Sequence, residues 1–431
     1  METEDVTVRE QLFHDRVRET IICVLLFICL YILSHFILTH FKKNAEFVTD
    51  DIEDATVNKI ALWLCTFTLS VAVCAVLLLP ISILSNEVLL TFPHSYYMQW
   101  LNGSLIRGLW NLVFLFSNLS LVFLMPFAYF FTESEGFAGS KKGIMARVYE
   151  TAVMLLLLSL LVLGIVWVAS ALIHHNTARE SLYDLWEYYL PHLYSGISLF
   201  GVLLLLCKSI KNYSCFILVS SVIELRKRAS PWQRNLGYPV AMLLLLALTA
   251  VSVLMVCFHV LELLFDESAM PRGMEDPHLG LASFSMFGSL GAAVQVVIIL
   301  YLMVSSVVGF YSSPLFTGLL PRAQDTTLTQ IIGNCVSLLI LSSALPVFSR
   351  TLGITRFDLL GDFGRYNWLG SFHLVFLYNM LFAGLTSACL INTVTWALQR
   401  ELIRAFVQVK PHLPHLGHNV DYHNLNTVSK I

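Results

Sequence analysis

Residues 151–172 read TAVMLLLLSLLVLGIVWVASAL, a run of 22 residues without a charged side chain. At 1.5 Å per residue a helix of this length extends about 33 Å, enough to cross the roughly 30 Å hydrocarbon layer of a bilayer. Lipid offers the backbone no hydrogen-bond partner, so such a run must close its hydrogen bonds within a helix. The stretch therefore predicts a transmembrane helix.

Eight further runs share this length and apolar character, without the alternation that is typical of outer-membrane β-barrel strands. The nine predicted spans are residues 21–38, 60–84, 108–131, 151–172, 188–207, 238–264, 284–310, 331–348 and 369–393. Pro80, Pro126 and Pro346 fall inside or near the ends of three spans, where neighbouring helices accommodate a kink. The fold class is therefore predicted to be all-α, a polytopic membrane protein with about nine transmembrane helices.

The composition of the whole chain supports this prediction. Its 431 residues are 57% hydrophobic and 13% charged, which is about half the charge content of an average soluble domain. The net charge of −3, with no basic run longer than Arg226-Lys227-Arg228, argues against nucleic-acid binding.

The chain carries no motif that is typical of catalysis or of metal binding. Eight of the nine cysteines lie in apolar runs and no Cys-x-x-Cys pair occurs, so neither a disulfide framework nor a zinc site is expected. Sequence patterns of zinc proteases, serine hydrolases and P-loop nucleotide-binding proteins are also missing. We expect a protein that is not an enzyme and needs no cofactor.

The distribution of Lys and Arg predicts the orientation, because positive residues are retained on the cytosolic side. Loops one, three, five and seven share a side with the C-terminal tail and hold 17 of the 26 Lys and Arg residues. The N-terminus is thus expected outside or in the lumen. The predicted divisions are an outer segment (1–20), helices one to five (21–207), a cytosolic loop (208–237), helices six to nine (238–393) and a cytosolic tail (394–431).

Polar residues inside spans are a common sign of function, because burying them in lipid is costly. His259 and Glu262 lie on one face of the sixth span, and Gln295 lies in the seventh. His259 and Glu262 would suit a proton or cation path. Alternatively, Glu262 lies in the interfacial region near the end of its span and Gln295 bonds a neighbouring helix.

Asn102-Gly103-Ser104 is an N-glycosylation sequon in the second loop, on the predicted outer side. The aromatic-rich residues 96–100 before it are typical of a segment at the level of the lipid headgroups. Topology permits modification of Asn102, whereas its closeness to the bilayer leaves the occupancy open.

The eighth loop, residues 349–368, is too polar to span a membrane and too apolar to be a free loop. Arginines and aspartates balance one another there and are interleaved with aromatic residues, a composition typical of binding surfaces and amphipathic caps. The predicted ligand-binding residues of this outer loop are Arg356, Phe357, Asp358, Asp362, Phe363, Arg365 and Trp368. A purely structural cap is the alternative interpretation.

Several long strings resemble the limb region membrane protein family, and the match is closest to its lipocalin-interacting membrane receptor branch. These strings are QWLNGSLI (99–106), TESEGFAG (132–139), SLYD (181–184), YLMVSSVVGFY (301–311) and RFDLLGDFGR (356–365). The resemblance implies a nine-span protein of the plasma membrane or endoplasmic reticulum with an outer N-terminus. It also implies endocytosis of a secreted lipocalin, negative regulation of Wnt signalling, and Wnt-pathway and endoplasmic-reticulum quality-control components as partners.

The chain departs from this family between the fifth and sixth spans. Family members look to have a long, charged, partly coiled-coil segment there, whereas only residues 208–236 remain in this chain. Residues 210–223 do not resemble the family, and those from Glu224 onward do. A splice variant or a gene model that skips exons would produce this pattern.

Two functions follow as hypotheses. The first is a receptor or signalling regulator whose outer loops bind a secreted lipocalin. The second is a transporter or escort protein for a small apolar ligand, whose path would be lined by His259, Glu262 and Gln295. The scarcity of charge inside the spans favours the receptor.

Overall fold

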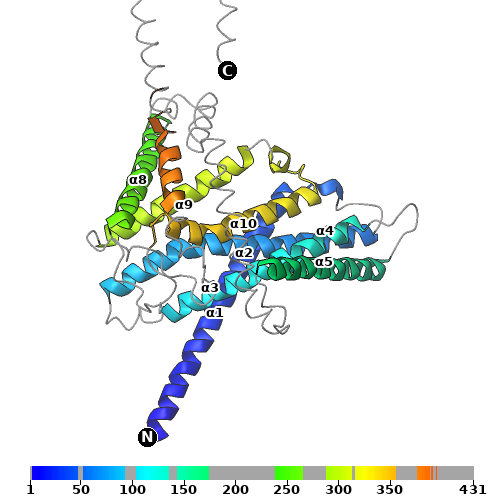
Figure 1. Cartoon of the computed structure of the whole chain (residues 1–431). Helices are drawn as coiled ribbons and strands as arrows, with labels where there is room; N and C mark the ends of the chain where they lie inside the picture. The colour runs from blue at the N-terminus through cyan, green and yellow to red at the C-terminus, as the bar shows by residue number, and fades with distance from the viewer. Residues whose placement is uncertain are drawn as a thin grey trace, which may run out of the picture.

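The computed structural model describes residues 2–46, 52–92, 103–134, 143–173, 238–265, 288–312, 316–355, 376–388, 390, 391 and 395. Within these ranges the chain is almost entirely helical, and the isolated β-bridge found there pairs Lys42 with Thr326. The long helices are α1 (Glu2–Phe41), α2 (Ile52–Thr91), α3 (Gly103–Leu119), α4 (Met125–Glu133), α5 (Ile144–Ile173), α8 (Tyr238–Phe265), α9 (Gly288–Ser312) and α10 (Leu328–Thr351) (Figure 1). Shorter turns are η1 (Asn44–Glu46), the π-helical η2 (Ser120–Leu124) and η5 (Thr317–Leu319).

Seven helices of the described part are long and apolar enough to cross a membrane. They are Val17–Phe41, Ile52–Leu89, Gly108–Glu133, Ile144–Gly164, Leu243–Phe265, Leu290–Tyr311 and Leu328–Thr351. They coincide with predicted spans one to four and six to eight, which confirms an all-α polytopic membrane protein. The fifth predicted span, residues 188–207, lies outside the described residues. The ninth is represented by the shorter apolar helix Phe376–Ala388.

Two elements differ from the predicted ranges for local reasons. Helix α1 already begins at Glu2 rather than near residue 21, because residues 2–41 contain no glycine or proline that would interrupt it. The third span is divided by η2, directly before Pro126 in the first turn of α4. A proline ring clashes with the carbonyl four residues earlier, here that of Val122, and a widened π-helical turn relieves that clash.

The helices fall into central and peripheral members. In their most apolar stretches, 72% of the residues of α10 and 61% of those of α2 are buried, against 17% for α1 and for α5. Large apolar side chains project outward from the peripheral helices, as Leu156 and Leu160 do from α5. This pattern is expected where lipid, which is as apolar as leucine, replaces water around the bundle.

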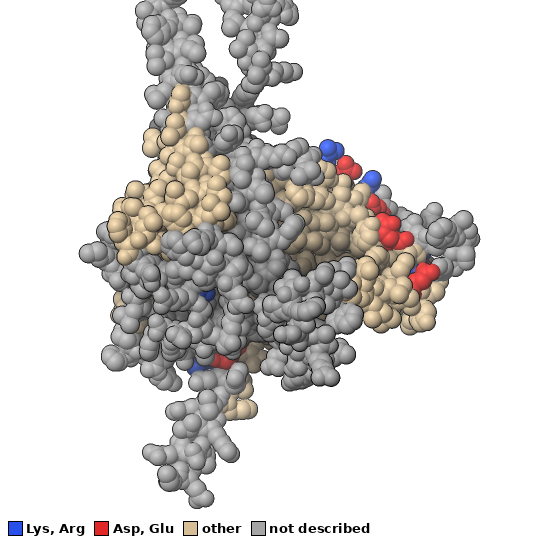
Figure 2. All heavy atoms as spheres, in the orientation of Figure 1, with Lys and Arg blue, Asp and Glu red and all other residues tan. Residues whose placement is uncertain are grey.

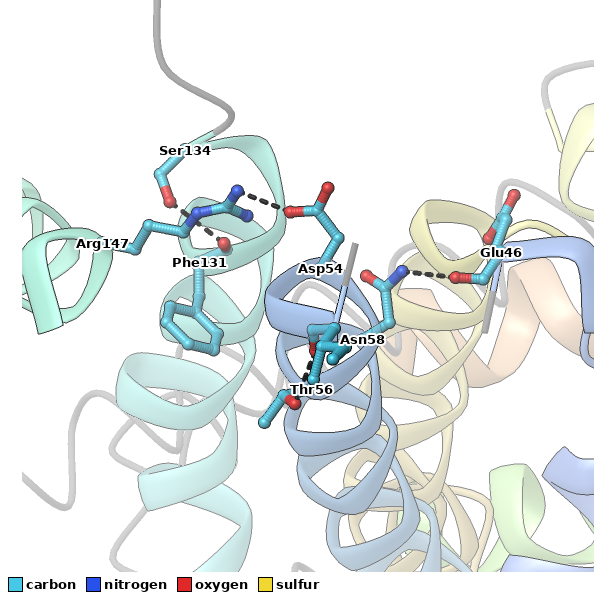
Figure 3. A network of polar contacts seen from close by, with 8 residues as sticks. Glu46, Asp54, Thr56, Asn58, Phe131, Ser134 and Arg147 are labelled. Atoms are coloured by element: carbon cyan, nitrogen blue, oxygen red, sulfur yellow. Dashed lines mark hydrogen bonds and ion pairs between the residues drawn. The ribbon is translucent and has the colours of Figure 1, made fainter. Parts of the chain in front are cut away.

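One end of the bundle is held together by polar contacts between segments far apart in the sequence (Figure 3). The carboxylate of Glu46 accepts a hydrogen bond from the backbone N–H of Leu328 at 3.0 Å, at the start of α10. The backbone carbonyl of Glu46 accepts another from Asn58 of α2 at 2.8 Å. Arg147 of α5 pairs with Asp54 of α2 at 2.5 Å. The contacts bring together loops one, three and seven.

The backbone adds to this connection. Lys43 N–H donates to the carbonyl of Thr326 at 3.0 Å, and Thr326 N–H donates to that of Phe41 at 3.2 Å. Many of the described charged side chains visible in Figure 2 gather at this end, over η1 and the first turn of α2. The charged residues of η1 and of the first turn of α2 are Glu46, Glu53 and Asp54, and Lys42 and Lys43 directly precede η1.

Toward the opposite end, α2 contacts α3, and α10 contacts the helix Phe376–Ala388. Trp110 in the middle of α3 donates its indole N–H to Ser82 in the second half of α2 at 3.1 Å. Asn379 of the helix Phe376–Ala388 bonds the last turn of α10. Loops one, three and seven therefore share one end, and loops two and eight share the other, as the alternation of spans predicts.

Cysteine labelling tests this arrangement. Asn44, Asp325 and Phe92 are exposed, so we expect single variants Asn44→Cys and Asp325→Cys to react with a membrane-impermeant maleimide from one side, and Phe92→Cys from the other. The unsubstituted chain measures the reaction of the native cysteines. Labelling of Asn44→Cys and Asp325→Cys from opposite sides would contradict the fold.

Candidate functional site: the turn at the end of α10

The last turn of α10 forms a Schellman motif. Leu352 ends the helix, Gly353 N–H bonds the carbonyl of Arg350 at 3.1 Å, and Ile354 N–H bonds that of Ser349 at 2.9 Å. This pair of hydrogen bonds satisfies carbonyls that a helix end otherwise leaves open. The motif needs a left-handed residue after the helix, and Gly353 supplies it with φ +69°.

Gly353 also provides room for the predicted intramembrane residue His259. A Cβ atom on Gly353 would lie 2.5 Å from His259 Nδ1, far inside van der Waals contact. The imidazole of His259 is buried, and its neighbours Val256 and Val260 belong to the same hydrophobic cluster as Leu352. Helix α8 thus packs directly against the turn, with the histidine at the point of closest approach.

The helix Phe376–Ala388 closes another side of the turn. Asn379, fully buried, donates its side-chain amide to the carbonyl of Thr351 at 2.8 Å. The ring of Phe348 contacts those of Tyr378 and Phe382 edge-on, with centroids 6.4 and 5.6 Å apart. Three described helices therefore converge on this one turn.

The turn leads into the predicted ligand-binding loop. Ser349 and Thr355 are buried, and their hydroxyl oxygens lie 3.1 Å apart in a hydrogen bond that closes the turn on itself. Arg356, the first residue predicted to bind ligand, follows Thr355 directly. The described turn is thus the anchored base of the eighth loop.

The other predicted site residues are distributed as follows. Gln295 is buried in α9, and Glu262 lies in α8 one turn before its end at Phe265. Asn102 lies outside the described residues. So do the seven loop residues Arg356, Phe357, Asp358, Asp362, Phe363, Arg365 and Trp368. Within the described part of the chain, no group of three or more His, Cys, Asp or Glu side chains is arranged to hold a metal ion.

The sequence interpretation missed Gly353 and Asn379. A glycine directly after a long apolar helix is a known sign of a Schellman end, so Gly353 was within reach of sequence reasoning. Asn379 carried a weaker sign, as a lone amide within an apolar run, and its partner on α10 could not be inferred from spacing.

The fold defines a class, that of polytopic all-α membrane proteins. The family model described as LMBR1-like membrane protein matches residues 19–208 and 216–394, and the chain belongs to this family. The interruption falls inside the loop 208–237 that is expected to be shortened.

Similar proteins cover nearly the whole chain. Limb region 1 homolog-like protein of Danio rerio is 83% identical, over 94% of each chain. Protein LMBR1L of Homo sapiens is 61% identical over 96% of each chain, and Limb region 1 protein homolog of Homo sapiens is 54% identical over 95% of each chain. The alignment with the Danio rerio protein runs over 463 positions against 431 residues here, so that relative contains residues this chain lacks. No solved structure matches the chain.

Replacing Gly353 tests the turn. Gly353→Ala forces an alanine into a left-handed conformation and against His259, so we expect a loss of about 1 kcal/mol or more in stability. The measurement is the thermal midpoint of the purified protein in detergent. Gly384→Ala in the helix Phe376–Ala388 is the control, because a Cβ there meets no atom within 4 Å. Equal midpoints for the two variants would contradict the packing of His259 on this turn.

Proposed function

We propose that this protein is a multi-pass membrane receptor that binds a secreted lipocalin through its eighth loop and mediates its endocytosis, and that it also restrains Wnt signalling. The proposal places it in the plasma membrane, the endoplasmic reticulum membrane or both, with the N-terminus outside or in the lumen. Wnt-pathway and endoplasmic-reticulum quality-control components are its proposed cytosolic and membrane partners. No catalytic role and no cofactor are part of the proposal.

The observation that carries the proposal is the anchored base of the eighth loop. Loops that bind proteins bind more tightly when less conformational freedom is lost on association, and a fixed base reduces that loss. Thr355, the residue directly before the aromatic and arginine-rich segment, is buried and hydrogen bonded. Aromatic residues and arginine are the side chains that most often dominate protein interfaces.

The scarcity of buried charge supports a receptor over a transporter. Among the Lys, Arg, Asp and Glu side chains that the structure describes, only that of Arg147 is buried. It lies beside Asp54, at the end of the bundle where loops one, three and seven meet. Transporters of ions and protons usually carry ionisable groups near the middle of the membrane. Apart from Arg147, the buried Asp, Glu, Lys, Arg or His side chain among the described residues is that of His259.

The alternative function, an escort protein or transporter for a small apolar ligand, keeps one observation in its favour. His259 and Gln295 are both buried within the bundle, and polar residues in spans often mark a substrate path. A flux measurement separates the two functions, since a receptor needs no passage through the bundle.

One experiment decides between them. A labelled lipocalin carrying a photo-crosslinker is added to cells that express the chain, and ligand flux is measured in parallel in reconstituted liposomes. Crosslinking at the eighth loop without flux supports the receptor. Flux without crosslinking supports the transporter and overturns the proposal.

The aromatic side chains of the eighth loop provide a sharper test. We expect the triple variant Phe357→Ala, Phe363→Ala, Trp368→Ala to weaken lipocalin binding by a few kcal/mol, since buried aromatic anchors cost about 2 kcal/mol or more each when truncated. Surface expression should stay normal. Tyr149→Ala, which removes an exposed aromatic from the opposite end, is the matched control. Unchanged binding at normal expression would remove this loop from the site.

The shortened fifth loop gives another expectation. The charged coiled-coil segment that longer relatives are expected to carry would dock cytosolic proteins through heptad contacts. We expect this chain to bind lipocalin normally but to recover fewer cytosolic partners in affinity purification than a chain with the long loop inserted. An insertion of equal length in glycine and serine is the control. Equal recovery with all three chains would show that the partners dock elsewhere.

A further inference from the structure

Helices α5 and α8 cross the bundle in the same direction. Arg147, in the first turn of α5, pairs with Asp54 at the end where loops one, three and seven meet, so α5 ends toward the other side. In α8 it is the later residue His259 that reaches this other side, where it packs against Gly353 at the base of the eighth loop. Helix α8 therefore begins on the side where α5 also begins, and the chain must cross back between them.

The length of the apolar runs shows which segment makes this crossing. Residues 188–207 are 20 residues without Asp, Glu, Lys or Arg, which as a helix extend about 30 Å, the thickness of the hydrocarbon layer. The apolar run 215–223 has nine residues and would extend only about 13 Å. The return crossing therefore falls to residues 188–207, the fifth predicted span.

Spans that follow one another in the sequence contact one another throughout the described part of the chain. The pairs in contact are α1 with α2, α2 with α3, α4 with α5, α8 with α9, and α9 with α10. The last turn of α10 is bonded in the same way by the helix Phe376–Ala388 that follows it. Short connections favour such neighbours. The fifth span is thus expected beside α5, α8 or both.

Helix α8, at the edge of the described bundle, has one occupied and one open face (Figure 1). On the occupied face, the hydroxyl oxygens of Thr249 and Tyr301 of α9 lie 2.7 Å apart, and Val256 and His259 are buried. Residues two positions away lie on nearly the opposite side of a helix. These exposed residues, which we call the α8 seam, are Ala247, Ala250, Leu254, Cys257, Leu261 and Leu264.

The composition of the α8 seam favours a helix over lipid as its partner. Contact with lipid chains is provided equally well by leucine, whereas helices in a membrane associate where small residues let the backbones approach closely. The seam has small side chains at Ala247, Ala250 and Cys257. The fifth span likewise contains small residues near its middle, at Ser195, Gly196, Ser198 and Gly201.

We propose that the α8 seam is the docking surface for residues 188–207 of the same chain, which pack antiparallel to α8 on the face turned away from α9. Three observations combine in this assignment: the required return crossing, the contact between consecutive spans, and the small residues on the open face. The proposal does not depend on lipocalin binding at the eighth loop.

Disulfide cross-linking tests the docking surface, because the native thiol of Cys257 is exposed in the α8 seam. A protease site is inserted into the loop 208–237, so that a cut separates the fifth span from α8. Single cysteines are then placed at each position from Tyr188 to Gly201, and the membranes are oxidised with copper phenanthroline before the cut. We expect the two fragments of one chain to stay joined at positions that recur every three to four residues, until a reductant is added.

The matched control repeats each variant with Cys257→Ser, in which the fragments should separate. Fragments that separate at every position even with Cys257 present show that lipid covers the seam, and overturn the proposal. A link between two C-terminal fragments through Cys257 shows that a second copy of the chain occupies the seam, and also overturns it.

A bulky substitution in the α8 seam provides a second readout that needs no added cysteine. We expect Ala250→Phe to lower the thermal midpoint of the purified protein by several degrees, because an enlarged side chain overpacks a helix interface but is tolerated against lipid. Cys29→Phe is the control, since Cys29 is exposed on the peripheral helix α1. Equal midpoints for the two variants overturn the proposal.

Discussion

The pairing of α2 with α10 is the contact on which the other described helices depend. Glu46 accepts hydrogen bonds from Leu328 in the first turn of α10 and from Asn58 of α2. The two helices therefore start at the same end of the bundle. Further along, the Cys335 thiol lies 3.6 Å from the carbonyl of Cys65. Each of the three hydrophobic clusters contains side chains from both helices. Since lipid gives apolar side chains no reason to gather, close packing of this kind must hold a membrane bundle together.

The central position of α10 imposes a requirement on its ends. The carbonyl and N–H groups at a helix end can bond water where the end lies at a surface. At a buried helix end, other parts of the protein must provide their hydrogen-bond partners. At its start α10 uses a capping box of Thr327 and Gln330 together with the carboxylate of Glu46. At its end it uses the Schellman turn at Gly353. Both ends thereby become attachment points, the first for loops one and seven and the second for the proposed binding loop.

The sequence interpretation was most successful where one physical term dominates. The length and evenness of seven apolar runs predicted seven spans because the cost of exposing backbone to lipid outweighs local preferences. The same reasoning could not predict the early start of α1 at Glu2, since nothing in a hydropathy pattern marks a helix that continues outside the membrane. It noted Pro126 as a kink and missed the π-helical turn, whose geometry depends on how the neighbouring helices pack.

By itself the sequence determined the class of protein, the alternation of its loops and the composition of the eighth loop, because hydrophobic length and charge act residue by residue along the chain. Only the tertiary structure decided which distant residues meet. It placed His259 of α8 against Gly353, Asn379 against the last turn of α10, and Glu46 against Leu328, nearly three hundred residues away. Such contacts depend on the rotation and tilt of packed helices, which shape complementarity fixes and which no spacing within a single span records.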